Sequence, residues 1–236
     1  MHVPGAGLDW TVAPRLEVGY RMPRGFGEWL ITYRFIATSG SADLIGEQGI
    51  GHLASRFDAN TMDFVYANRD YPLGPGWEMR WKVGVELASF YYDTHLNLAT
   101  ASGALDQGAS NRFVGAGPYA GLELSRELPF PGLSLYGQVE GASIWNRNRQ
   151  TFGETVTPVG GGVSPLTGAA QDTRSQGVAV VRAQAGLSWS PSPSQATRIF
   201  LGYSWEAWFQ VLRDDTTGSF GDFYANGIFL RGEIRF

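Results

Sequence analysis

Apolar and polar side chains alternate along most of this chain. Between Trp77 and Leu87 every odd position is apolar or aromatic, and every even position is charged or glycine. A period of two places one set on each face of a β-strand, whereas a helix would spread both sets around its axis. The same alternation over 180–189 and 198–210 predicts an all-β protein.

By this test the chain contains nine strands and no segment that reads as a helix. They are expected at roughly 11–22, 28–37, 58–67, 77–91, 112–126, 133–146, 178–190, 197–210 and 223–236. Each is about as long as a tilted membrane strand of about 9–11 residues. No linker divides them, so residues 1–236 are expected to form one domain.

The connectors between these strands alternate in length. The short ones, rich in Pro and Gly, are 23–27, 68–76, 127–132 and 191–196; the longer ones are 38–57, 92–111, 147–177 and 211–222. Bacterial outer-membrane barrels have short periplasmic turns and long extracellular loops. The alternation therefore favours a transmembrane antiparallel up-and-down β-barrel with the short connectors in the periplasm.

The last strand carries a second indication of this fold. Counting back from Phe236, the apolar positions include Ile234, Leu230 and Ile228. An amphipathic last strand that ends in Phe resembles the assembly signal of outer-membrane barrels. We expect these four residues to engage the barrel-assembly machinery, with the last strand running toward the periplasm.

Two kinds of barrel fit the alternation, and their interiors are opposite. A lipocalin-type soluble barrel points its apolar set inward, whereas a membrane barrel points it at lipid and keeps a polar lumen. Seven of the eight tryptophans fall in the apolar set, most of them near strand ends, where the aromatic girdles of membrane barrels lie. Charges are nearly absent from that set away from strand ends. This favours the membrane barrel over the soluble one.

The polar set is then expected to line the lumen, with nine basic and nine acidic side chains. These are Arg15, Glu17, Arg21, Glu28, Arg34, Asp63, Glu78, Arg80, Lys82, Glu86, Glu123, Glu140, Arg182, Arg198, Glu206, Arg231, Glu233 and Arg235. Because unpaired buried charge is costly, so many charges in a narrow interior must pair. They form either a neutral salt-bridge ladder that rigidifies the barrel or a hydrated pore lined by fixed charges.

Composition adds exclusions rather than a function. The formal net charge is −4. Because the acids and bases of the lumen balance, this charge is expected outside the lumen, mostly in loops. No basic surface indicates nucleic acid as a partner. Absence of cysteine excludes disulfides, thiolate metal sites and thiol nucleophiles. No apolar run approaches the about 18 residues of a membrane-spanning helix.

The strand count is odd, although bacterial single-chain barrels have even counts. If the last strand runs toward the periplasm, the strand at 11–22 does so as well, and a strand of opposite direction ought to precede it. Residues 1–7 also lack the basic start and apolar core of a signal peptide. We therefore expect a longer intact protein with a signal peptide and ten or more strands.

Residues 115–146 resemble a hairpin of the Legionella-type major outer membrane protein family. The resembling elements are Gly115-Ala-Gly-Pro118, Gly121-Leu122, Gly132-Leu-Ser-Leu-Tyr-Gly137 and Gly141-Ala-Ser143, and those of the preceding hairpin are Asp63-Phe-Val-Tyr66 and Trp81-Lys-Val-Gly-Val85. The resemblance implies an outer-membrane porin or porin-like protein. At Glu86-Leu87 this chain departs from the basic and aromatic pair expected there, and no catalytic residue is carried over.

Few residues offer chemistry of another kind. Asp93 and His95 share a strand face near the extracellular rim, where some barrel enzymes hold their catalytic groups, and they form the third hypothesis. His52 lies in a glycine-rich loop. The acidic segment 213–222 lacks the spacing of a calcium loop, so it is expected to be a solvated turn rather than a loose divalent-ion site.

The sequence thus predicts a porin-like outer-membrane barrel that passes small solutes or ions through a charged lumen. The alternative is a closed structural or surface-interaction barrel without a conducting pore. The expected partners are outer-membrane lipid and lipopolysaccharide, the assembly machinery and small solutes or ions. No cofactor, metal or catalytic residue is expected.

Overall fold

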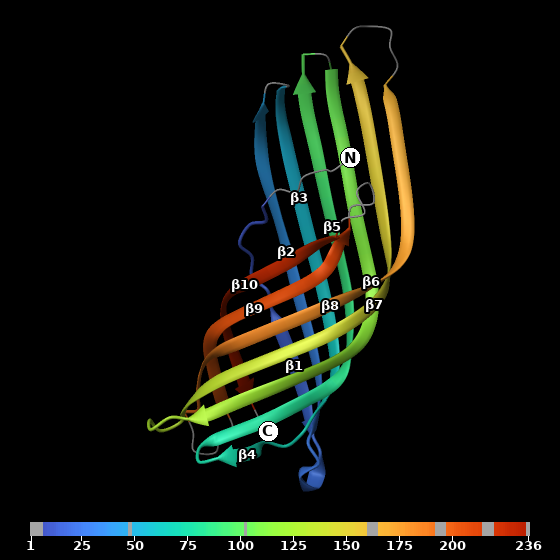
Figure 1. The fold of residues 1–236 in the computed structure, drawn as a ribbon. Helices are drawn as coiled ribbons and strands as arrows, with labels where there is room; N and C mark the ends of the chain where they lie inside the picture. Colours follow the sequence, from blue (N-terminus) through green and yellow to red (C-terminus); the bar gives the residue numbers. More distant parts are fainter. Residues whose placement is uncertain are drawn as a thin grey trace.

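The computed structural model describes residues 7–46, 49–101, 103–159, 165–191, 197–213 and 220–234, and almost all of them lie in strands (Figure 1). The strands are β1 (Arg15–Arg21), β2 (Glu28–Gly46), β3 (Gly49–Ala67), β4 (Tyr71–Gly74), β5 (Trp77–Thr100), β6 (Gly103–Glu127), β7 (Leu133–Pro158), β8 (Leu166–Trp189), β9 (Thr197–Arg213) and β10 (Phe220–Ile234). The remaining element is a single 3-10 turn, η1 (Pro23–Gly25). The all-β prediction is confirmed.

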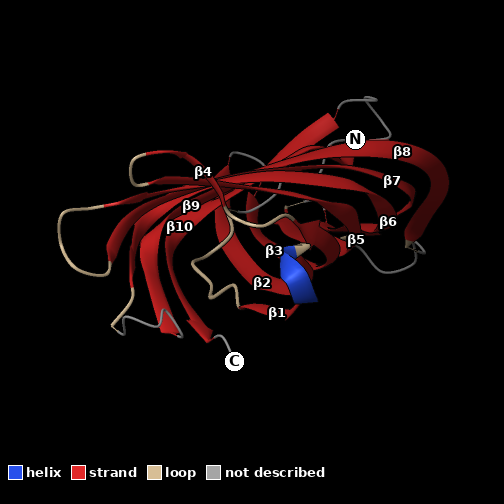
Figure 2. Cartoon of the chain, turned by 90° about the horizontal axis from the view of Figure 1, so that it is seen from below, coloured by secondary structure: helices blue, strands red, loops and turns tan. Residues whose placement is uncertain are grey.

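The strands form one antiparallel up-and-down sheet in chain order, β1-β2-β3-β5-β6-β7-β8-β9-β10. The sequence did not predict β4, a short strand inside the connector 68–76 that pairs only with β5. Seen end on, the sheet curls around an interior (Figure 2). Because every neighbouring pair is antiparallel, β1 and β10 run in the same direction, and no ladder joins them among the described residues.

The central strands are much longer than the sequence predicted. Segments 38–46, 49–57, 92–100, 103–111, 147–158 and 166–177, expected as loops, continue the ladders of β2, β3 and β5 to β8. We call this continuation the extension; it rises beyond the curled part of the sheet, which holds β1, β9 and β10 (Figure 1). The loop interpretation of these segments was wrong.

The extension was missed because its two faces exchange polarity. In the curled part of β5 the outward residues include Val83, Val85 and Leu87, whereas in the extension they are Asp93, His95 and Asn97. The inward residues change from charged to apolar along the same strand. A period of two persists, but with the polar set outward, as in a strand whose outer face meets water.

The N-terminal described segment protects one edge of the sheet. Residues 11–14, predicted as part of the first strand, run beside β2 without a regular ladder. The Asp9 amide donates to the Ser39 carbonyl at 3.0 Å, and the Phe35 amide donates to the Pro14 carbonyl at 3.2 Å. Proline has no amide hydrogen to donate, so the regular ladder of β1 begins only at Arg15.

The β6–β7 ladder is irregular at Gly117 and Pro118 of β6. The β6–β7 ladder is interrupted between the pairs Ala116–Trp145 and Tyr119–Ala142, although the register is the same on both sides. A Cβ at Gly117 would overlap the backbone carbonyl of Ser143. Only glycine allows this close approach, and Pro118 has no amide hydrogen to donate to the ladder.

We expect Gly117→Ala to destabilise the fold by about 1–3 kcal/mol, the usual cost of inserting a group into packed structure. The matched control is Gly153→Ala on β7, where an added Cβ meets no atom within 4 Å. Urea unfolding in detergent, followed by tryptophan fluorescence, measures both. Equal stability of the two variants would contradict the close approach at Gly117.

Candidate functional site

The outer face of the curled part is an apolar band. On β5 it runs from Trp77 to Leu87 in alternate positions, and β9 and β10 continue it with exposed Leu201, Ile228 and Leu230. Ten residues at about 3.3 Å each, at a tilt of about 40°, give a band about 25 Å tall, the height found in transmembrane barrels. The band therefore matches the hydrocarbon layer of a membrane.

The inner face behind this band carries most of the charges that the sequence assigned to the lumen. The structure places inward Arg15, Glu17, Glu28, Arg34, Asp63, Arg80, Lys82, Glu86, Glu123, Glu140, Arg182, Arg198, Glu206, Arg231 and Glu233. Arg21 lies at the rim with a side chain 64% exposed, 3.9 Å from Glu28, and Glu78 is exposed at the start of β5. Arg235 and Phe236 lie outside the described residues, and the backbone alone is described at Ile234.

Arg182 joins opposite walls of the interior. Its Nη1 and Nη2 donate to Oε2 and Oε1 of Glu86 at 2.7 and 2.5 Å, and its Nε donates to Glu206 at 2.9 Å. Glu86 lies on β5 and Arg182 on β8, which are not neighbours in the sheet, so the pair spans the interior. Both side chains are buried, and the bidentate geometry is the strong form of this pairing.

Glu140 of β7 also joins strands that are far apart in the sheet. Its oxygens lie 3.6 Å from Arg15 of β1 and 3.8 Å from Arg34 of β2. Arg34 also pairs with Asp63 at 2.8 Å and lies 3.9 Å from Glu86. We call these residues, with Arg182 and Glu206, the transverse charge layer.

Further pairs continue toward the short connectors. Lys82 pairs with Glu123 at 2.9 Å, and Arg80 of β5 pairs with Glu28 of β2, which is separated from β5 in the sheet by β3. Arg231 of β10 donates to the Tyr136 hydroxyl of β7 at 3.3 Å. The charges thus form a paired column rather than isolated groups, as a low-dielectric surrounding requires.

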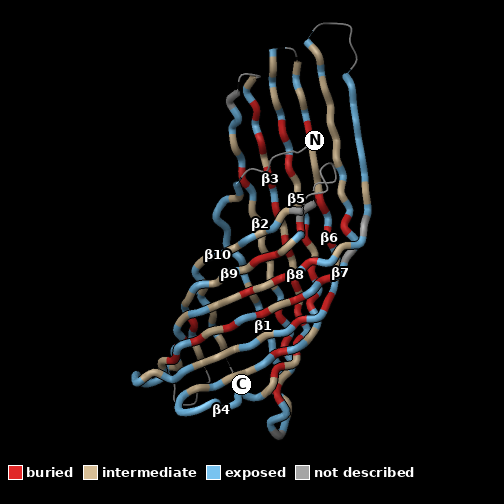
Figure 3. The backbone as a smooth tube through the Cα atoms, in the orientation of Figure 1, coloured by how far each residue is buried: buried red, intermediate tan, exposed pale blue. Residues whose placement is uncertain are grey.

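An aromatic layer lies above the transverse charge layer, at the base of the extension. Phe57 stacks on Phe223 with ring centroids 4.1 Å apart, and Phe90 stacks on Phe113 at 4.3 Å. Trp208 meets Phe90 edge-on and donates through Nε1 to Glu206 at 2.7 Å, which connects the two layers. Figure 3 marks the buried positions in red along the strands, where they alternate with exposed or half-buried ones.

Sequence reasoning did not find the aromatic layer. Phe57 fell in a predicted loop, and Phe113 was counted only as part of a strand pattern. Trp208 carried a usable signal, because it is the one tryptophan outside the apolar set of the predicted strands. A large aromatic residue at an inward position of a membrane strand indicates that the interior is filled there.

The hydrogen-bonding capacity of the transverse charge layer is not used up by protein. Buried atoms without a hydrogen-bond partner include Nε and Nη1 of Arg15, Nε of Arg34 and Oδ1 of Asp63. Buried charged groups need such partners, and water supplies them where protein does not. The layer is therefore a place where water or a small ion can bind.

The candidate catalytic pair is formed but lies elsewhere. His95 Nε2 lies 3.0 Å from Asp93 Oδ2 on the outer face of the extension, beside a hollow of about 290 Å³. His52 makes a similar contact with Asp43 at 2.9 Å. The same hollow is lined by Ser39, Ser41 and Ser55, and a catalytic role of the pair stays a prediction.

The described segments contain no group of three or more His, Cys, Asp or Glu side chains arranged to hold a metal ion. These segments also contain no helix that is long and apolar enough to cross a membrane.

An apolar outer band around a charged inner face, on an up-and-down antiparallel sheet, defines the class of transmembrane β-barrel proteins. Residues 4–236 match the family model of the Legionella pneumophila major outer membrane protein precursor. The chain belongs to this family and is an outer-membrane protein, as the sequence predicted. No curated protein and no solved structure matches it.

Breaking the Arg182–Glu86 pair tests the transverse charge layer. Arg182→Met leaves Glu86 and Glu206 without their main partner, and we expect a loss of about 3–5 kcal/mol in the free energy of unfolding. The double variant Arg182→Met, Glu86→Gln should lose less than the sum of the single losses. Urea titration in detergent measures this, with Arg21→Met at the exposed rim as the control that stays near wild type. Strictly additive losses would show that the two groups do not interact.

A charge on the outer face tests the position of the band. Val83→Arg places a guanidinium near the middle of the band and should cost about 2–4 kcal/mol in a bilayer. Asn97→Arg, on the same face of the same strand but in the extension, should change stability by less than about 0.5 kcal/mol. Reversible unfolding from lipid vesicles gives both values. A similar cost at both positions would contradict the boundary.

Proposed function

We propose that this protein is a porin-like channel for small ions, with the transverse charge layer as its constriction. The observation that carries the proposal is the charged inner face at membrane depth, where Arg15, Arg34 and Asp63 have buried polar atoms not satisfied by protein. Ionisable side chains at membrane depth are rare because they are costly, and they commonly line the path of a solute or an ion. The family description supports an outer-membrane location and leaves the conducting role to be tested.

The geometry limits what can pass. Arg182 and Glu86 meet across the interior, and above them Phe90 and Trp208 come from non-neighbouring strands. A permeating species must pass between these groups, or the groups must separate first. The path therefore suits hydrated ions rather than larger solutes. Because acidic and basic groups are interleaved, we expect weak selectivity between cations and anions.

A closed structural barrel is the second candidate, and the same cross-wall contacts favour it. If the ion pairs and stacked rings never separate, the charges act only as a ladder that holds the walls together. In that case the outer surface and the extension would carry the function. The two candidates differ in one measurable property, ionic conductance.

Single-channel recording in planar bilayers separates them. We expect small, discrete conductance steps from the folded full chain, and steps several-fold larger from the neutral pair Glu86→Ala, Arg182→Ala, which opens the constriction. Val83→Ala, on the lipid face, should leave the step size unchanged. Loss of one acid by Glu140→Gln should shift the reversal potential toward anion preference.

Silence from the folded wild type and from the opened variant would refute the channel and favour the closed barrel. Folding of each variant is checked independently by the heat-dependent shift in electrophoretic mobility that is typical of membrane barrels.

A further inference from the structure

Three exposed arginines gather on the outer face just above the apolar band. Arg112 of β6 and Arg149 of β7 are direct register partners on the same face, and Arg147 precedes Arg149 by two residues on β7. Like charges directly opposite one another destabilise a sheet. Such an arrangement is expected where an anion from outside the chain lies between the guanidinium groups.

Within the described part of the chain, no carboxylate lies in ion-pair distance of Arg112 or Arg147. Arg149 donates to Gln171 Oε1 at 2.9 Å, which leaves its charge uncompensated. Asp93, the nearest acid in register on the neighbouring β5, lies opposite Ser110 and contacts His95 at 3.0 Å. The cluster therefore keeps a net positive charge at the surface.

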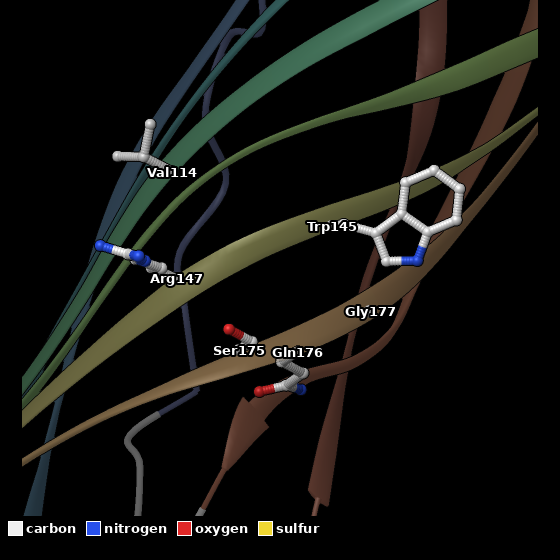
Figure 4. A pocket seen from close by; sticks show the side chains of 6 residues that line it. All are labelled: Val114, Trp145, Arg147, Ser175, Gln176 and Gly177. Atoms are coloured by element: carbon white, nitrogen blue, oxygen red, sulfur yellow. The ribbon is translucent and has the colours of Figure 1, made fainter.

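A groove of about 560 Å³ begins beneath this cluster. It is lined by Val114 of β6, Trp145 and Arg147 of β7, and Ser175, Gln176 and Gly177 of β8 (Figure 4). Gly177 is the register partner of Trp145, and the indole ring lies over it, 3.5 Å from the position that a Cβ would take. The β8–β9 ladder ends at the pair Ala179–Phe209, and beyond it Gln176 of the groove donates to the Gln210 carbonyl of β9.

The groove crosses the boundary of the membrane. Trp145 is 63% exposed and Val114 55% exposed at the upper edge of the band, and Arg147 and Ser175 lie on the polar side. Tryptophan belongs to the aromatic girdle at the membrane interface. An apolar wall with guanidinium groups above it matches an amphiphile whose phosphate lies next to its acyl chains.

We propose that this groove binds the phosphorylated glycolipid of the outer leaflet, lipopolysaccharide. Its phosphate lies between Arg112, Arg147 and Arg149, and an acyl chain lies along Trp145 and Val114. Arginine suits this role because its fork binds phosphate oxygens through two parallel hydrogen bonds. The orientation with short connectors in the periplasm brings the groove to the outer leaflet. The proposal concerns the outer surface and does not depend on conduction through the interior.

Titration of the detergent-solubilised full chain with fluorescent lipopolysaccharide tests it. The wild type should bind this lipid at least tenfold more tightly than the same lipid with its phosphates removed, since charge-assisted contacts are worth about 1.5–3 kcal/mol. The double variant Arg112→Gln, Arg147→Gln should lose that preference. Arg56→Gln, at an exposed outward arginine of β3 that pairs with Asp58, is the matched control and should bind like the wild type.

Gly177→Leu gives an independent test, because it fills the groove and leaves every arginine in place. It should weaken lipid binding without changing the mobility shift of the folded protein. Equal binding of the two lipids by the wild type, or unchanged binding by both variants, would overturn the proposal. Displacement of the lipid by millimolar inorganic phosphate would also overturn it, since it would indicate a free-anion site.

Discussion

The pairing of charges across the interior is the constraint on which the rest of this structure depends. A guanidinium and a carboxylate at membrane depth are tolerable only when each satisfies the other, because isolated buried charge is far more costly than any packing gain. Arg182 of β8 pairs with Glu86 of β5 and Glu206 of β9. Glu140 of β7 is approached by an arginine of β1 and an arginine of β2. The walls must therefore curl until these groups meet, so the pairing fixes how narrow the interior is.

The same constraint explains why the two halves of each long strand differ. Within the band, lipid demands apolar side chains outward, and the charges have only the interior left to occupy. In the extension, water replaces lipid, so Asp93, His95 and Asn97 face outward, and Phe90 and Leu96 face inward. The change of polarity between Leu87 and Asp93 of β5 marks where the membrane ends.

This change also decides how far the sequence alone could predict the structure. Nine strands, their order and the inward charges follow from one rule, alternation with a polar lumen, because that rule holds throughout the band. The extension obeys the opposite rule with smaller and more mixed side chains, so segments such as 92–100 and 103–111 looked like loops. Which charges pair could not be predicted, since Arg182 and Glu86 are brought together only by curvature. The short strand β4 lacks any period long enough to detect.

Viewed from the lipid side, the boundary has a chemical consequence of its own. On β7 the apolar band ends at Trp145, and Arg147 and Arg149 follow on the same face. One strand thus presents an apolar surface and, directly beyond it, an anion-attracting surface. Inside, arginines pair with carboxylates, so their charge is balanced within the protein. Outside, Arg112 and Arg147 have no such partner in the described chain, so their charge is available to the surroundings. Paired arginines hold the walls together, and unpaired ones at the rim can fix the barrel at its depth in an anionic leaflet. The role of an arginine in this barrel therefore depends more on its position relative to the band than on its residue type.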